Sequence, residues 1–332
     1  MHNPKKLKQK FIILIFGPTA VGKSSFAESL GREIPSQIIN CDIGQFYTPL
    51  TIGTAKPDWK SSDIKHHLFD IIDEPKQYNV CQYRDLLFQT AKNIWSDDTI
   101  PILVGGSGFY LKSLFFPPID YKMVQAVNKT DSAVCGVELW DMLQRVDPVR
   151  ASSIEKNDIY RIRRALNIYK ETGKRPSELI PVYDFPSNFL LIFLTRDRKE
   201  LYERIDKRVL QMLDEGWIEE VEGLLSTDWE GFLQEKKLIG YDIIIRYLKG
   251  DREERSRQQM IDTIQKKTRN YAKRQITFWK SFEAQLKTAI KEIKATKQST
   301  PVDSKIIPIN LTLSNFDLYL KKLLSYLNPL FE

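Results

Sequence analysis

The stretch that decides the fold is FIILIFGPTAVGKS, residues 11–24. Its first six residues are aliphatic or aromatic and a glycine follows them, which predicts a buried parallel strand. The remainder has the pattern GxxxxGK[ST] and leads into a helix predicted from Ser24 to about Arg32. Backbone N–H groups of such a loop, with the helix N-terminus, bind phosphate oxygens. The sequence therefore predicts a phosphate or diphosphate site formed by Gly17, Pro18, Thr19, Ala20, Val21, Gly22, Lys23 and Ser24.

Two side chains of this loop add specific chemistry. Lys23 supplies a point charge for terminal phosphate oxygens, and the hydroxyl of Ser24 is a ligand for Mg²⁺. The spacing does not say whether the phosphate belongs to a nucleoside triphosphate, so the owner of that phosphate stays open at this point.

Length and composition indicate a globular chain of one or two domains. It has 332 residues, of which 42% are hydrophobic and 28% charged. A net charge of +7 is in the direction expected for a nucleic-acid partner or an anionic substrate. Cys41, Cys81 and Cys135 lie far apart, which argues against a disulfide framework or a paired-cysteine zinc site and favours the reducing cytoplasm. No apolar run is long enough to span a bilayer, so a soluble protein is expected.

The alternation of strand and helix patterns predicts an α/β fold with a doubly wound, mostly parallel sheet. After residues 11–16, strands are expected at residues 36–41, 68–72, 100–106, 188–195 and 305–310, with helices at 79–96 and 314–327. A helical texture between the fourth and fifth strands predicts an inserted domain. The expected division is a core of residues 10–116 and 188–290, a helical insert of 117–187, and a C-terminal strand and helix, 291–332, that pack on the core.

Asp42 directly follows the second predicted strand. The carboxyl ends of parallel strands line the ligand crevice of open α/β sheets, so a carboxylate here is placed to take a proton or to hold a metal through water. The alternative is a turn cap, which is the role of most loop aspartates. The position beside the phosphate loop favours the functional interpretation.

Other polar clusters leave two interpretations open. Ser107 lies in a second glycine turn, where it contacts a ligand or packs the turn. Arg161, Arg163 and Arg164 share a predicted helix and either neutralise phosphates or form a solvated helix face, and the same choice applies to Arg204 and Arg208. The aromatic residues of the basic helix at 266–280 belong to the core or stack on bases, and the core is the commoner role.

Several blocks together resemble the tRNA dimethylallyltransferase (isopentenyltransferase) family. They are GPTAVGKS, CDIGQFY, IGTAKP, HHLFDIIDE, PILVGGSGFYL, DIYRIRRALNIYKETGK, RIDKRVLQML and TRNYAKRQITFW, and they cover most of residues 11–280. The resemblance implies a P-loop NTPase-like core with an inserted helical domain. It also implies transfer of a dimethylallyl group from dimethylallyl diphosphate to the N6 amine of the adenosine 3′ of the anticodon, in tRNAs reading codons that begin with U. Mg²⁺ is the implied cofactor, and nothing in the sequence demands more than a monomer.

Residue roles follow from the same resemblance. Asp42 matches the general base, Thr19 a residue beside the bridging oxygen of the leaving diphosphate, and Arg208 a further diphosphate-binding residue. Lys23 and the loop amides match the diphosphate clamp, and Ser24 the Mg²⁺-linked hydroxyl. The positions that match tRNA-contacting segments are Asp42, Ile43, Gly44, Gln45, Ser107, Tyr160, Arg161, Ile162, Arg163, Arg164, Lys237, Leu238, Ile239, Gly240, Tyr241 and Asp242.

The chain departs from the family pattern at a few places. Ile43 stands where a serine is usual, Asp242 replaces a basic residue, and the segment after FFPPIDY lacks an expected arginine. The zinc-finger extension of eukaryotic relatives is absent, which points to a bacterial or organellar type. These departures bear on fine tRNA recognition and leave the expected catalytic set intact.

Two other functions compete with the prenyltransferase. One is a P-loop kinase of a nucleoside or small metabolite, in which Asp42 would activate a hydroxyl. The other is an RNA-binding protein that has lost turnover. The IGTAKP and TRNYAKRQITFW blocks argue against the kinase, and the presence of Thr19, Lys23, Asp42 and Arg208 argues against the non-catalytic protein.

Overall fold

The computed structural model describes residues 6–118, 136–179, 181–295, 304–313 and 316–331. The chain divides into two compact units, one formed by Met1–Leu111 with Pro186–Glu332 and the other by Lys112–Phe185. The predicted strand and helix of residues 291–332 belong to the first unit. Residues 119–135, in which most of the polar stretch after FFPPIDY falls, lie outside the described residues.

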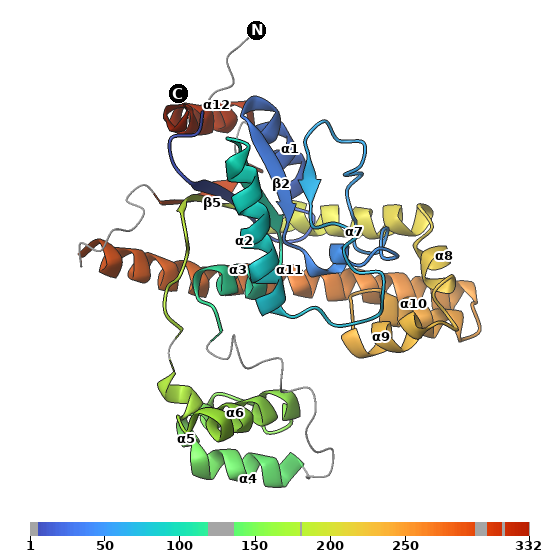
Figure 1. The fold of residues 1–332 in the computed structure, drawn as a ribbon. Helices are drawn as coiled ribbons and strands as arrows, with labels where there is room; N and C mark the ends of the chain where they lie inside the picture. Colours follow the sequence, from blue (N-terminus) through green and yellow to red (C-terminus); the bar gives the residue numbers. More distant parts are fainter. Residues whose placement is uncertain (1–5, 119–135, 180, 296–303, 314–315, 332) are drawn as a thin grey trace. The chain divides into compact units, whose positions relative to one another are not determined.

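The first unit is built on a six-stranded sheet whose pairs are all parallel (Figure 1). The strand order is β3-β2-β4-β1-β5-β6. This confirms the α/β class and the parallel sheet. The strands are β1 (Phe11–Phe16), β2 (Ser36–Asn40), β3 (His66–His67), β4 (Ile100–Gly105), β5 (Asn188–Thr195) and β6 (Lys305–Asn310).

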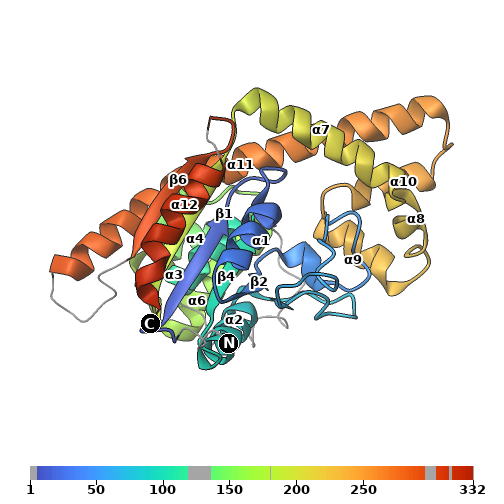
Figure 2. The same cartoon turned by 90° about the horizontal axis from the view of Figure 1, so that it is seen from above.

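Helices cover both faces of this sheet because its central strands are apolar on both sides. α1 (Lys23–Glu33) and α12 (Phe316–Leu327) lie over one side (Figures 1 and 2), where Phe26 and Leu323 join a core with Ile13 of β1. On the opposite side Trp279 of α11 (Glu254–Ala295) stacks on Phe193 of β5, with ring centroids 4.1 Å apart. α2 (Val80–Ser96) begins at Asn79, which forms a capping box with Gln82.

The remaining elements of this unit follow the strands or connect them. They are η1 (Ile43–Phe46), the first residues of α3 (Gly108–Phe115), α7 (Arg198–Asp214), α8 (Trp217–Glu222), α9 (Asp228–Lys236), α10 (Tyr241–Leu248) and η4 (Asn328–Leu330). No helix among the described residues is both long and apolar enough to cross a membrane.

The predicted strand at residues 68–72 is wrong. The strand is β3, two residues long, and Leu68 and Asp70 adopt left-handed conformations with φ of 62° and 50°. Left-handed residues break a strand, so Leu68, Phe69 and Ile72 are buried by a turn instead. The backbone of Ile72 donates to the carbonyl of Phe46, and the amide of Asn40 donates to the carbonyl of Leu68.

The second unit is helical and has its own small core. Its described elements are α4 (Gly136–Val146), α5 (Pro148–Ser152), α6 (Ile159–Thr172) and η3 (Pro176–Glu178), with the later part of α3. Leu143, Ala151 and Ile162 are buried together. Asp147 caps α5 by accepting from the backbone N–H of Arg150 and also accepts from that of Ser177, so one buried carboxylate joins α5 to η3.

Candidate active site

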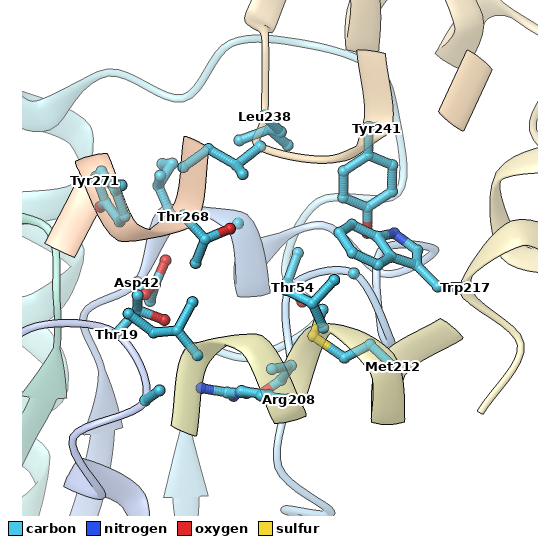
Figure 3. Close-up of a pocket in the computed structure, with 18 of the residues that line it drawn as sticks. Thr19, Asp42, Thr54, Arg208, Met212, Trp217, Leu238, Tyr241, Thr268 and Tyr271 are labelled. Atoms are coloured by element: carbon cyan, nitrogen blue, oxygen red, sulfur yellow. The ribbon is translucent and has the colours of Figure 1, made fainter. Parts of the chain in front are cut away.

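Two adjoining cavities lie at the carboxyl edge of the sheet, within the first unit. One, of about 440 Å³, is polar and is lined by Lys23 and Ser24. The other, of about 310 Å³, is largely apolar and is lined by Met212 and Trp217. Figure 3 shows the apolar cavity, with Thr19 and Asp42 on one side of the view and Trp217 on the other. The residues that line both cavities are Thr19, Ala20, Asp42, Thr54, Ala55, Arg208 and Tyr271.

Carbonyl groups of the phosphate loop, residues 17–24, accept hydrogen bonds from cationic side chains. Arg196 donates to the carbonyl of Val21 and Arg204 to that of Ala20, each at 2.9 Å. Lys23 Nζ donates to the carbonyl of Pro18 at 3.0 Å. The first N–H groups of α1, which begins at Lys23, have no acceptor within the helix. The loop therefore turns its carbonyls toward cations and keeps N–H groups of the helix N-terminus for an anion.

Three charged, partly exposed side chains line the polar cavity, and two of them, Asp42 and Arg208, also line the apolar one; the third is Lys23. Burial lowers the pKa of Lys23 to about 8, partly opposed by the charge of Asp42. Burial raises the pKa of Asp42, and the charges of Lys23 and Arg208 oppose that rise. Burial lowers the pKa of Arg208, and the charge of Asp42 opposes that fall. An anion that enters this site meets two cations that burial has left short of solvation.

Gln275 of α11 joins the phosphate loop to the end of β4. Its Oε1 accepts from the backbone N–H of Thr19 at 2.9 Å, and its Nε2 donates to the carbonyl of Gly106 at 2.6 Å. The side chain is 8% exposed. Sequence reasoning did not single out Gln275. The available signal was a polar residue on a buried helical stripe, three residues after Ala272 and four before Trp279.

The loop of residues 50–57 lines both cavities, and its first half is held by N–H groups. Glu220 of α8 accepts from the backbone N–H groups of Thr51 at 2.8 Å, Ile52 at 2.6 Å and Gly53 at 3.1 Å. The same carboxylate accepts from the hydroxyl of Tyr241 at 2.7 Å. Sequence reasoning missed Glu220 too, because it lies more than 160 residues from the loop it holds.

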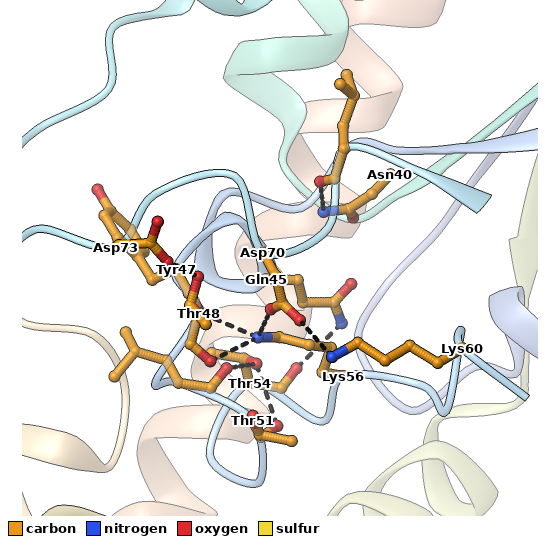
Figure 4. A network of polar contacts seen from close by, with 12 residues as sticks. Asn40, Gln45, Tyr47, Thr48, Thr51, Thr54, Lys56, Lys60, Asp70 and Asp73 are labelled. Atoms are coloured by element: carbon orange, nitrogen blue, oxygen red, sulfur yellow. Dashed lines mark hydrogen bonds and ion pairs between the residues drawn. The ribbon is translucent and has the colours of Figure 1, made fainter.

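A buried lysine holds the other end of the 50–57 loop (Figure 4). Lys56 forms an ion pair with Asp70, and its Nζ also donates to the carbonyls of Tyr47 and Thr48. Gln45 donates to the carbonyls of both Thr54 and Ala55 at 3.2 Å. Lys56, the lysine of the IGTAKP block, therefore positions this loop through its ion pair and hydrogen bonds.

Residues 45–282 match the family model described as IPP transferase. The chain belongs to the IPP transferase family. It is 33% identical over 287 residues to the tRNA dimethylallyltransferase of Alkaliphilus oremlandii, covering 83% of this chain and 90% of the relative. It is 37% identical over 278 residues to that of Thermotoga maritima, covering 82% of this chain and 90% of the relative. The resemblance expected from the sequence blocks is confirmed.

Solved structures agree. The chain is similar to the full-length tRNA isopentenylpyrophosphate transferase of Bacillus halodurans, with a TM-score of 0.63 and 29% identity over 97% of both chains. It is similar to a eukaryotic dimethylallyltransferase acting on tRNA, with a TM-score of 0.75 and 27% identity over 96% of this chain and 79% of that one. The chain is thus a prenyltransferase by family, and the small-molecule kinase is not favoured.

Of the positions expected to contact tRNA, several line the cavities of the first unit. Asp42, Ile43, Gly44, Lys237, Leu238, Ile239 and Tyr241 line the apolar cavity, and Gln45 lines the polar one. Ser107, Gly240 and Asp242 line neither of them. The carbonyl of Ser107 accepts from the N–H of Leu111 in α3, and Asp242 forms ion pairs with Arg246 and Lys267. The carboxylate of Asp242, which replaces the usual basic residue, is therefore already paired within the chain.

The expected tRNA-contacting residues of α6 belong to the second unit. Tyr160 is 71% exposed and Arg161 pairs with Asp158, whereas Ile162 is 0% exposed in the core of that unit. The side chain of Ile162 is therefore not available to an RNA, which corrects that part of the prediction. Helical periodicity explains the difference, because Ile162 and Ala165 lie on the buried stripe of α6 and Tyr160 does not.

Proposed function

We propose that this chain transfers a dimethylallyl group from dimethylallyl diphosphate to the N6 amine of the adenosine 3′ of the anticodon, in tRNAs reading codons that begin with U. One observation carries the proposal. Thr19, Asp42 and Arg208 line both a polar cavity next to the phosphate loop and an apolar cavity beside it. A bond between a diphosphate and a hydrocarbon group would lie and break at this junction.

The leaving group determines what the polar cavity must do. As the bond between carbon and the bridging oxygen breaks, its electron pair and negative charge pass to the diphosphate. Lys23, Arg208 and the N–H groups at the start of α1 stabilise that charge. Thr19 lies at the junction, and Gln275 fixes its backbone. These groups hold a departing diphosphate and transfer no phosphoryl group.

The nucleophile needs a base because the lone pair of an exocyclic amine is delocalised into the ring. Asp42 takes the proton that N6 loses as the bond between nitrogen and carbon forms. Burial raises the pKa of Asp42, which makes it a stronger base than an exposed carboxylate. Burial also raises the pKa of the neighbouring Cys41 to about 12, so that residue stays a neutral thiol and does not compete for the proton.

Mg²⁺ fits the donors at the phosphate loop. The hydroxyl of Ser24 lines the polar cavity beside Lys23, and hard oxygen donors completed by substrate phosphates are the usual ligands of this ion. When bound, the ion adds positive charge that stabilises the diphosphate. Ser24 would hold it, and the remaining chemistry belongs to the side chains already described.

The RNA presents a base that must leave its stack to reach the junction. We assign the mouth of the apolar cavity, at Ile43, Lys237 and Leu238, to the target adenosine. The net charge of +7 favours an anionic polymer as partner. We propose that the chain acts as a monomer in the cytoplasm, which supplies both tRNA and reducing conditions for the thiols of Cys41 and Cys81.

Transfer to an anticodon stem-loop tests the proposal directly. We expect the protein, with labelled dimethylallyl diphosphate and Mg²⁺, to prenylate a stem-loop whose loop carries three consecutive adenosines. Asp42→Asn should lose about 10²- to 10⁴-fold of the rate and still bind the RNA, because only the base is removed. Asp63→Asn is the matched control, since Asp63 is exposed and pairs with Arg32. No transfer, together with ATP-dependent phosphorylation of a metabolite, would sink the proposal.

Arg208 provides a separate test of the donor side. Arg208→Ala should raise KM for dimethylallyl diphosphate and leave RNA affinity unchanged, because the guanidinium lies at the junction beside the phosphate cavity. A fall in RNA affinity with unchanged donor KM would mean that Arg208 is misassigned.

A further inference from the structure

The apolar cavity has one end rich in polar groups and another lined by buried side chains, which we call the closed end. At the closed end lie Val209, Met212, Trp217 and Tyr241, all less than 9% exposed. Figure 3 shows Met212, Trp217 and Tyr241 together on the side away from Thr19 and Asp42. At about 310 Å³, the cavity is at the lower end of the roughly 300–1,000 Å³ typical of small-molecule sites.

Helix α7 gives the direction and the length of this cavity. Arg208 lines both cavities, and Met212, four residues later on the same helix face, lines only the apolar one. Four residues advance a helix by about 6 Å, slightly more than one turn. A dimethylallyl group whose diphosphate is held next to Arg208 extends about this far, so its methyl groups reach Met212 and the indole beyond it.

Close backbone contacts hold the indole of Trp217 in place. A Cβ on Gly53 would overlap its Nε1, and a Cβ on Gly240 would overlap its six-membered ring. The ring of Tyr241 meets it edge-on, with centroids 5.8 Å apart. The hydroxyl of Tyr241 and the N–H of Gly53 both donate to Glu220. Trp217 therefore cannot move away from a longer ligand without displacing two backbone segments and a shared carboxylate.

We propose that Trp217 determines the length of the prenyl group that this enzyme accepts, admitting a five-carbon donor and excluding a ten-carbon one. The inference rests on the proposed function. A second isoprene unit would have to occupy the volume that the indole fills, and close packing leaves no alternative route at that end. Trp217 acts here as a specificity-determining residue and takes no part in the bond-breaking step.

Competition between two donors measures this selectivity. The experiment compares kcat/KM for dimethylallyl diphosphate and for geranyl diphosphate, with the anticodon stem-loop as acceptor, in the wild type, Trp217→Leu and Trp217→Ala. One misfitting methylene changes selectivity about 10- to 200-fold. We expect the ratio of geranyl to dimethylallyl transfer to rise at least ~10-fold in both variants, since the ratio cancels general loss of activity.

Trp229→Leu is the matched control. Trp229 is also a buried tryptophan, packed on Tyr47 and Phe232, and it lines neither cavity. The control should lose stability without a change in the donor ratio. An equal rise in the control would assign the effect to loosened packing and overturn the inference.

Each remaining outcome has one meaning. If the wild type transfers neither group, the proposed function fails. If it transfers the five-carbon group and folded Trp217→Leu keeps the wild-type ratio, the inference fails alone. If circular dichroism shows that both Trp217 variants are unfolded, Met212→Ala is measured instead, because it enlarges the same end of the cavity one helical turn nearer the diphosphate. An unchanged ratio of geranyl to dimethylallyl transfer in Met212→Ala overturns the inference, and a rise in that ratio supports it.

Discussion

The phosphate loop and the 50–57 loop line the same two cavities, but the N–H groups at the start of α1 and those of residues 51–53 are used differently. At the phosphate loop the carbonyls of Ala20 and Val21 accept from Arg204 and Arg196, and the first N–H groups of α1 have no acceptor within the helix. In the 50–57 loop three N–H groups donate to Glu220, and the carbonyls of Thr54 and Ala55 accept from Gln45. The start of α1 thus leaves N–H groups available to an anion, whereas the N–H groups of residues 51–53 already have a carboxylate of the protein as their acceptor. We therefore expect only the first loop to bind a diphosphate.

Removing the cation of the phosphate loop should give the largest effect. Lys23→Met should lower the transfer rate about 10²- to 10³-fold, the usual cost of losing one stabilising donor for developing negative charge. Binding of inorganic diphosphate, measured by calorimetry, should weaken as well. The control is Lys207→Met, at the rim of the same cavity. Equal losses in the two variants would contradict the special role of Lys23.

The pH profile of kcat/KM should separate the two charged groups at the junction. Asp42 must be ionised to act as base, so activity falls as pH drops through its raised pKa. Lys23 must be charged to bind the donor, so activity falls about tenfold per pH unit above its pKa of about 8. Lys23→Arg should move the alkaline limb upward and leave the acid limb in place. An unmoved alkaline limb would assign it to another group.

Changing the carboxylate of Glu220 should affect the second loop alone. Glu220→Gln removes the charge from four hydrogen bonds, and charge-assisted bonds contribute about 1.5–3 kcal/mol each in favourable cases. We expect the transfer rate to fall ~10-fold while binding of inorganic diphosphate stays unchanged. Glu222→Gln is the control, since Glu222 pairs with Arg252 at the surface. Weakened diphosphate binding in Glu220→Gln would remove the distinction between the two loops.

The smallest effect is expected outside both loops. Arg161→Ala should weaken RNA binding a few-fold and lower the slope of log affinity against log salt by about 1, as expected for one phosphate contact. Donor KM should not change. Lys321→Ala in α12 is the control for a general change in charge. An unchanged salt slope would leave α6 without a role in RNA binding.

The sequence predicts those elements and site residues that are determined by residues close to one another in the chain. The strand of residues 11–16 and its glycine loop are local patterns, and Asp42 follows its strand by one residue beyond Cys41. Gln275 and Glu220 act on segments more than 160 residues away, and each looks like an ordinary polar residue of a helix. Leu68, Phe69 and Ile72 are buried by tertiary contacts although the backbone turns there, so an apolar pattern typical of a strand belongs to a turn.

The spacing of three side chains along α7 also limits which insertions and deletions the chain can tolerate. Arg204 donates to the phosphate loop, Arg208 to the carbonyl of Ala55, and Met212 lines the closed end of the apolar cavity, at successive four-residue steps. One residue added or removed between them would rotate everything downstream by about 100°. Single-residue insertions within residues 204–212 should therefore abolish function, whereas insertions in the connection after α8 should leave it intact. Insertional scanning with a selection for function would locate this boundary without a purified substrate.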